Sequence, residues 1–183
     1  MTTKYSILYA NPPWGYAGKT QHTDGEFKEG MSAKDHYPTM KLDVLKALPI
    51  ASITEPNALL FLWTSSPHLP QAIALMEAWG FQYKTIAFIW DKQKTNPGYY
   101  SLSQCEVCLV GKRGCIPTPR GDRTVRQFLS ELRGEHSKKP DEIRNRIQRM
   151  FPTQKKVELF ARQKSEGWDV YGNEVEGSIS LPS

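Results

Sequence analysis

The feature that most limits the fold of this chain is a continuous apolar run, Ala58-Leu-Leu-Phe-Leu-Trp63. A strand with one face in water alternates apolar and polar residues, whereas a strand covered on both faces does not. The run therefore predicts a central strand with helices packed on both faces of its sheet. Parallel sheets of α/β folds have this arrangement.

Apolar runs and helical patterns alternate along the rest of the chain. We expect further strands at Tyr5–Ala10, Lys84–Trp90, Gln104–Gly111, Lys156–Arg162 and Trp168–Tyr171. Apolar residues at helical spacing predict helices over Lys41–Leu48, over His68–Trp79 and from Pro140 to just before Pro152. This alternation implies an α/β fold with a mostly parallel sheet and helices on both faces.

Length and composition describe an ordinary globular domain. The chain has 183 residues, of which 39% are hydrophobic and 23% charged. We expect a single domain over residues 1–176, followed by a polar tail over residues 177–183. No apolar stretch approaches the roughly 20 residues that span a bilayer, and Met1–Lys4 leads straight into a strand. These observations predict a cytoplasmic protein that does not enter a membrane.

The net charge of +5 is unevenly distributed. Basic residues outnumber acidic ones between Lys112 and Arg149. A polyanion such as a nucleic acid is the natural partner of such a stretch. An ordinary solvated surface is the alternative, and a charge of this size does not decide between them.

Three cysteines, Cys105, Cys108 and Cys115, are too few for a disulfide framework. Cys105 and Cys108 have a spacing found in zinc sites, with His136 as a distant possible ligand. However, no second Cys-x-x-Cys pair is present, and the segment Cys105–Gly111 is predicted to be a buried strand. We therefore expect core cysteines and no metal.

The chemically most informative segment is Asn11-Pro12-Pro13-Trp14, directly after the first strand. Proline fixes its own φ and pushes the preceding residue out of the helical region, so this corner is nearly rigid. We expect its carbonyls to have no strand partner. Asn11 Oδ1 and the Pro12 carbonyl can accept hydrogen bonds from an amine, and Trp14 can stack on a flat ring. An ordinary turn with a packed tryptophan is the alternative.

Two long segments fit no regular element. Gly15–Met40, which contains His22 and His36, is polar, and Lys112–Lys138 is basic and interrupted by glycine and proline. Long irregular segments inside a compact domain are usually functional loops or disordered. Ligands of open α/β sheets bind at the carboxyl ends of strands, where the first segment leaves the Asn-Pro-Pro-Trp corner. We expect both segments, residues 15–40 and 112–138, to contact the substrate.

Several short blocks occur in a fixed order along almost the whole chain. Besides the corner they are Leu60–Trp63 with Pro67–Pro70, Glu77–Phe81, Leu109–Gly114, His136–Glu142, Glu158–Arg162, Gly167-Trp168 and Gly172–Glu174. Together they resemble the MT-A70 family of adenine-N6 methyltransferases, in its small phage and bacterial form. The resemblance extends from residue 5 to about residue 175.

The resemblance implies a Rossmann-like methyltransferase fold that uses S-adenosyl-L-methionine. The motif order of the family is permuted, so the catalytic corner comes first and the cofactor strand last. The absence of a Gly-x-Gly-x-x-Gly segment agrees with this order. Glu158–Arg162 would then occupy the cofactor strand without a glycine loop.

The resemblance also implies roles for single residues of the corner. Asn11 and Pro12 would hold the N6 amine, with Asn11 also close to the methionine part of the cofactor. Pro13 completes the rigid turn, and Trp14 would stack on the flipped adenine.

The cofactor would be held by residues later in the chain. By resemblance, Lys139 would pair with the methionine carboxylate, and Arg162, Asn173 and Glu174 would contact the ribose. Glu158 would orient Arg162. The alternatives are that Lys139 only flanks a helix start, that Glu158 pairs with a surface lysine, and that Asn173 makes a turn. No metal is required.

The chain departs from the family pattern at two places. The first residue of the corner is usually Asp, and here it is Asn11, the form common in DNA adenine methyltransferases. We therefore expect DNA, more than RNA, as the substrate. Gln163-Lys164 stands where many relatives that act on nucleosides have His-Asn, which puts one ribose contact in doubt. An inactive nucleic-acid-binding relative is a further alternative.

Overall fold

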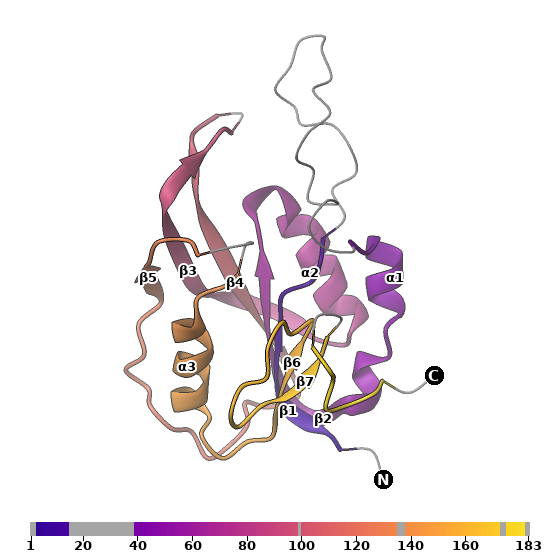
Figure 1. Cartoon of the computed structure of the whole chain (residues 1–183). Coiled ribbons are helices and arrows are strands. Elements are labelled where there is room, and N and C mark those ends of the chain that lie inside the picture. The colour runs from indigo at the N-terminus through magenta and orange to yellow at the C-terminus, as the bar shows by residue number, and fades with distance from the viewer. Residues whose placement is uncertain (1–2, 15–38, 99, 135–137, 173–174, 182–183) are drawn as a thin grey trace.

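The computed structural model describes residues 3–14, 39–98, 100–134, 138–172 and 175–181. In this part of the chain, seven strands form one sheet in the order β5-β3-β4-β2-β1-β6-β7 (Figure 1). The strands are β1 (Tyr5–Ala10), β2 (Thr54–Thr64), β3 (Gln82–Asn96), β4 (Ser103–Arg113), β5 (Phe128–Ser130), β6 (Lys156–Leu159) and β7 (Asp169–Tyr171).

Only one of these strands, β4, runs against the others. It pairs in antiparallel fashion with β2 and β3, whereas β1 is parallel to β2 and β6, β3 to β5, and β6 to β7. The carboxyl ends of the other six strands therefore meet at one edge of the sheet. The hairpin between β3 and β4 rises past this edge (Figure 1).

Helices cover both faces of the sheet. Those described are α1 (Leu42–Ala47), α2 (Leu69–Ala78) and α3 (Asp141–Met150), with 3-10 turns η2 (Ile50–Ile53) and η3 (Ser66–His68). The first core packs α1, η2 and α2 against one face, and the second packs α3 against the other. The predicted α/β architecture, with a mostly parallel sheet between helices, is confirmed.

Helix α2 ends as its sequence predicts. Gly80 has a φ of +85°, the left-handed conformation that glycine adopts without strain. The Gly80 N–H donates to the Glu77 carbonyl, and the Phe81 N–H donates to the Met76 carbonyl. These two bonds form a Schellman motif, which turns the chain directly into β3.

The predicted strands differ from the observed ones at several ends. Strand β3 extends to Asn96, whereas β6 already ends at Leu159. Strand β5 was not predicted at all, since it contributes only three residues to the edge of the sheet within the basic segment. Its register is set by pairing with Ile89–Asp91 of β3, which no local pattern reveals.

The expectation that the three cysteines are core residues holds only for Cys108. Cys105 and Cys115 are exposed, and all three thiols are free. Cys105 belongs to β4, but it lies near the start of the strand, where neighbouring residues are also partly or fully exposed. Among the described residues, no group of three or more His, Cys, Asp or Glu side chains could hold a metal ion.

The segment set apart as a polar tail also contacts the sheet. The Ser178 N–H donates to the Val170 carbonyl at 2.9 Å, and Ile179 and Leu181 pack against the first core. The division into a domain and a tail stays a prediction. None of the described helices is long and apolar enough to cross a membrane.

Candidate active site

The predicted corner lies at the edge where the carboxyl ends of the parallel strands meet. Asn11 follows the last residue of β1, and Pro12 is buried. The Asn11 side chain makes no hydrogen bond to any other residue that the structure describes. Its amide is therefore available to a ligand at this edge.

The backbone of the corner is more tightly bonded than the sequence suggested. The Pro12 carbonyl accepts from the Trp14 N–H at 2.9 Å, and the Pro13 carbonyl accepts from the Met40 N–H at 2.9 Å. Trp14 and Met40 thus form an isolated bridge. The expectation that these carbonyls have no strand partner was wrong for Pro13, because the chain returns at Met40 to pair with it. The Pro12 oxygen retains a second lone pair for a ligand.

Trp14 is held on its edge and on one face. Its Nε1–H donates to the backbone carbonyl of Trp63 at 3.3 Å. Its ring stacks on His68, with centroids 6.1 Å apart and an angle of 17° between the planes. The orientation of the indole is therefore fixed before any ligand binds.

Lys139 lies on the other side of Trp63, in a cluster of three charges that we call the lysine cluster. Its ammonium binds the carboxylate of Glu106 on β4, and Lys92 of β3 contacts the same carboxylate at 3.5 Å. The Lys139 Nζ also lies over the rings of Trp63 and Trp90, 5.6 and 5.8 Å from their centroids. Only 12% of the Lys139 side chain is exposed.

The lysine cluster carries more positive than negative charge, since two ammonium groups share one carboxylate. Burial lowers the pKa of Lys139, and the Glu106 carboxylate opposes this shift. The positive charges of Lys92 and Arg162 lower the pKa further. An anion placed beside Lys139 would stabilise its ammonium form and so oppose the shifts caused by burial and by the neighbouring positive charges.

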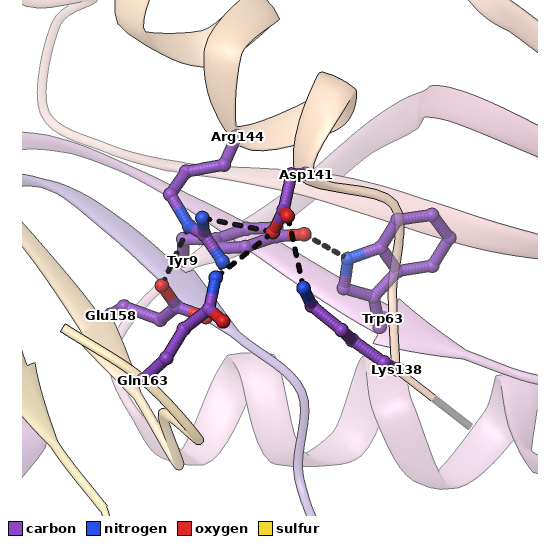
Figure 2. Close-up of polar contacts among 7 residues, drawn as sticks. All are labelled: Tyr9, Trp63, Lys138, Asp141, Arg144, Glu158 and Gln163. Atoms are coloured by element: carbon purple, nitrogen blue, oxygen red, sulfur yellow. Dashed lines mark hydrogen bonds and ion pairs between the residues drawn. The ribbon is translucent and has the colours of Figure 1, made fainter. Parts of the chain in front are cut away.

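A second group of charges, which we call the arginine cluster, joins helix α3 to strand β6 (Figure 2). Arg144 of α3 donates from Nε to Glu158 Oε2 at 2.8 Å and from Nη1 to Asp141 Oδ1 at 3.1 Å. Asp141 also accepts from Lys138 at 3.0 Å and from Gln163 at 3.2 Å. Burial raises the pKa of Glu158, and Arg144 opposes that shift.

Tyr9 and Trp63 connect the two clusters. The Trp63 Nε1–H donates to the Tyr9 hydroxyl at 2.7 Å (Figure 2). Tyr9 stands opposite Glu158 in the pairing of β1 with β6. Burial raises the pKa of Tyr9 well above its usual value, so its hydroxyl stays neutral. Trp63 thus touches Trp14 with its carbonyl, Lys139 with its ring face and Tyr9 with its N–H.

The structure brings together most of the residues that the sequence singled out. The corner and Lys139 meet at Trp63, and Arg162 is close enough for its charge to act on Lys139. The carboxylate of Glu158 binds Arg144, while its expected effect on Arg162 stays a prediction. Asn173 and Glu174 lie outside the described residues, as does most of the segment 15–40.

Glu106, Lys92 and Trp63 were not predicted as site residues. Glu106 stands between Cys105 and Cys108 and was considered only as part of a zinc-like spacing. Its position in a segment predicted to be a buried strand was the available signal, because a charged residue is rarely buried without a partner. The partner itself, Lys139, is 33 positions away along the chain.

Comparison with known proteins identifies the chain's relatives. The MT-A70 family model matches residues 5–174. The chain belongs to the MT-A70 family. The type II methyltransferase M.MunI of a Mycoplasma species is 48% identical over 98% of this chain and 82% of its own length. This MT-A70 protein is therefore a methyltransferase of the small bacterial or phage form, with the Rossmann-like fold of that class.

Other MT-A70 relatives are much longer than this chain. A putative N(6)-adenosine-methyltransferase MT-A70-like protein of Medicago truncatula is 30% identical over 95% of the chain, which covers 27% of that relative. The human N(6)-adenosine-methyltransferase catalytic subunit METTL3 is 26% identical over 95% of the chain, which covers 29% of that subunit. The chain spans between a quarter and a third of the length of these two relatives.

Proposed function

We propose that the protein transfers a methyl group from S-adenosyl-L-methionine to N6 of adenine in DNA. The observation that carries the proposal is the meeting of two groups at Trp63. Trp14 of the amine-accepting corner donates a hydrogen bond to the Trp63 carbonyl, and Lys139 of the positively charged lysine cluster lies over the Trp63 ring. The first suits the acceptor base and the second an anionic part of the methyl donor.

The lysine cluster fits the methionine carboxylate of the donor. Among the described residues, two ammonium groups and one carboxylate leave one positive charge in a nearly buried site. A buried charge without a partner is costly, so such a site favours a bound anion. Lys139 would bind that carboxylate, as the family resemblance implied, while Glu106, which also pairs with Lys92, holds the Lys139 side chain in place. Arg162, Asn173 and Glu174 remain the residues predicted to contact the ribose.

The corner fits an aromatic amine. Such an amine is a poor nucleophile because its lone pair is delocalised into the ring. Asn11 Oδ1 and the free lone pair of the Pro12 carbonyl would accept its two hydrogens and draw the nitrogen toward tetrahedral geometry. The donor's sulfonium supplies an intrinsically reactive methyl group: as the N6–CH3 bond forms, the S–CH3 bond would break to leave a neutral thioether, and N6 would release a proton after transfer. Alignment by the protein accounts for much of the remaining acceleration.

The preference for DNA has two supports. Asn11 is the form of the corner residue common in DNA adenine methyltransferases, and M.MunI is named a type II methyltransferase. The relatives named for adenosine N6 support the acceptor atom. A base inside a duplex is out of reach of this edge, so duplex DNA would require base flipping.

The basic stretch Lys112–Arg149 has fewer available charges than its sequence suggested. Arg144, Arg146 and Arg149 pair with carboxylates of their own chain. Arg123, Arg126 and Arg133 are exposed. These three are the residues that we expect to contact the phosphate backbone.

The test is methyl transfer to adenine-containing DNA from labelled S-adenosyl-L-methionine, with N6-methyladenine identified in the product. Asn11→Ala and Trp14→Ala should each lower the rate at least about 100-fold, because they remove positioning groups at the reacting atom. Asn145→Ala, which truncates an exposed asparagine of α3, is the matched control and should retain activity. Full activity of both corner variants would refute the assignment.

Two alternatives give different results in the same experiments. A relative that binds nucleic acid without catalysis should give no heat when titrated with S-adenosyl-L-methionine in a calorimeter. An RNA methyltransferase should bind the cofactor and methylate RNA oligonucleotides in preference to DNA of the same sequence. Sequencing of methylated adenines in DNA from cells that express the chain would define its recognition sequence.

A further inference from the structure

We propose that His68 is a positioning residue that holds Trp14 for the acceptor base. The inference rests on the proposed function, in which Trp14 stacks on adenine. His68 lies after β2, and Trp14 lies after β1, the strand next to it. From the sequence, His68 was expected only to begin a helix and to belong to the family block Pro67–Pro70.

The contacts of Trp14 define what His68 does. The imidazole covers one face of the indole, at a centroid distance within the usual range for stacked rings. The Trp63 carbonyl binds the indole N–H. Together the two contacts fix the indole plane and leave at most one face for a second ring. Trp14 can therefore stack on one base and cannot be sandwiched between two.

His68 is itself held by the turn that carries it. Its backbone N–H donates to the Ser65 carbonyl at 3.0 Å, and its Nδ1 lies 2.8 Å from the Ser65 hydroxyl. Burial lowers the pKa of His68, which favours the neutral imidazole at physiological pH. A neutral ring packs against the indole without a charge that would have to be solvated beside the substrate.

The positioning has a kinetic consequence. A side chain that is already ordered loses less freedom when the ligand binds, and each such side chain is worth about 3- to 10-fold in affinity. Loss of the stack should therefore weaken acceptor binding by about this factor, and misalignment should lower kcat as well. Cofactor affinity should not change, because Lys139 and Glu106 lie on the other side of Trp63.

The experiment compares His68→Ala, which removes the ring, with His68→Phe, which keeps a flat ring but removes Nδ1. Ser65→Ala is the third variant and keeps the imidazole. The readouts are KM for adenine-containing DNA, kcat, the dissociation constant of S-adenosyl-L-methionine by calorimetry, and the urea midpoint. Acrylamide quenching of Trp14 is obtained by difference from the same variant carrying Trp14→Phe.

We expect His68→Ala to raise the DNA KM about 3- to 10-fold and to increase the quenching of Trp14, with cofactor affinity unchanged. His68→Phe should restore both properties. If His68 only stabilised the fold, the rise in DNA KM of the Ala and Phe variants would follow the fall in their urea midpoints. That result, or unchanged KM and quenching in His68→Ala, would overturn the proposal.

The quenching measurement needs neither DNA nor methyl transfer. If the wild-type protein transferred no methyl group to any nucleic acid, the proposed function would fail. Unchanged quenching in His68→Ala would then refute the positioning of Trp14 separately. Should His68→Ala not fold, His68→Phe and Ser65→Ala decide the case, since a normal KM is expected of the former and an increase of at most about 3-fold of the latter.

Discussion

The lysine cluster and the arginine cluster lie on either side of Tyr9 and Trp63 but differ in charge balance. In the arginine cluster, Lys138 and Arg144 are opposed by Asp141 and Glu158, so two positive charges meet two negative ones. In the lysine cluster, Glu106 is the one carboxylate among the described residues that pairs with Lys92 and Lys139. The first is complete without a ligand, whereas the second has one positive charge to spare.

The difference separates a structural role from a binding role. A buried ion pair that is fully matched ties α3 to β6 and needs nothing further. A buried cluster with an excess charge is tolerated when its site is used to bind an ion of the opposite sign. Glu158 was predicted as a cofactor residue from the family pattern, and its contacts place it in the balanced cluster.

The largest effect on stability is expected in the arginine cluster. Glu158→Gln leaves Arg144 buried with an incomplete partner and should lower the free energy of unfolding by about 3 kcal/mol. Urea unfolding measures the loss. The double variant Arg144→Met/Glu158→Leu, which removes both charges, should recover most of it. If Glu158 instead acts on the cofactor, the double variant would fold normally and still lose cofactor affinity.

The largest effect on ligand binding is expected in the lysine cluster. Lys139→Met should remove the proposed charge-assisted bond to the cofactor carboxylate, worth about 2 kcal/mol or roughly 30-fold in affinity. It should cost little stability, because Lys92 and Glu106 then form a balanced pair. Lys138→Met, an exposed neighbour that binds Asp141, is the control and should bind the cofactor normally. Calorimetry with S-adenosyl-L-methionine distinguishes the two variants.

The smallest effect is a dependence on pH. Burial lowers the pKa of Lys139, so its ammonium is lost at a lower pH than that of an exposed lysine, near 10.4. Cofactor affinity should therefore fall as pH rises through this lowered pKa. The contribution of Lys139 to the free energy of unfolding should instead rise over the same pH range. Between the lowered pKa and the usual value, the unfolded chain binds a proton that the folded chain does not. In Lys139→Arg the affinity should persist to higher pH; an identical profile in both proteins would contradict the role of Lys139.

The fold could largely be predicted because its signals are local. The run Ala58–Trp63 is buried as a central strand, and Gly80 ends α2 as its position suggests. Strand β5 carried no such signal, since Phe128 is half exposed and its partner lies almost forty positions earlier in β3. Hydrogen bonding to a neighbour defines this strand, and its own residues do not.

The site could be predicted only as far as its residues share a motif. Asn11–Trp14 and Lys139 stand in recognisable blocks. The groups that hold them, Glu106 for Lys139 and His68 for Trp14, come from distant segments. Their contacts follow from the order of strands in the sheet, which a single sequence does not state.

The backbone bridge between Trp14 and Met40 has a consequence for how such proteins diversify. The chain leaves the corner Asn11–Trp14 at Trp14 and pairs with it again at Met40, so the bridge holds the two ends of the intervening segment together. The entropic cost of closing a loop grows only slowly with its length. Segments of different length and sequence can therefore replace one another at this point while the corner keeps its geometry. If residues 15–40 contact the substrate as proposed, exchange of residues 15–39 between relatives should transfer sequence preference and leave the chemistry unchanged.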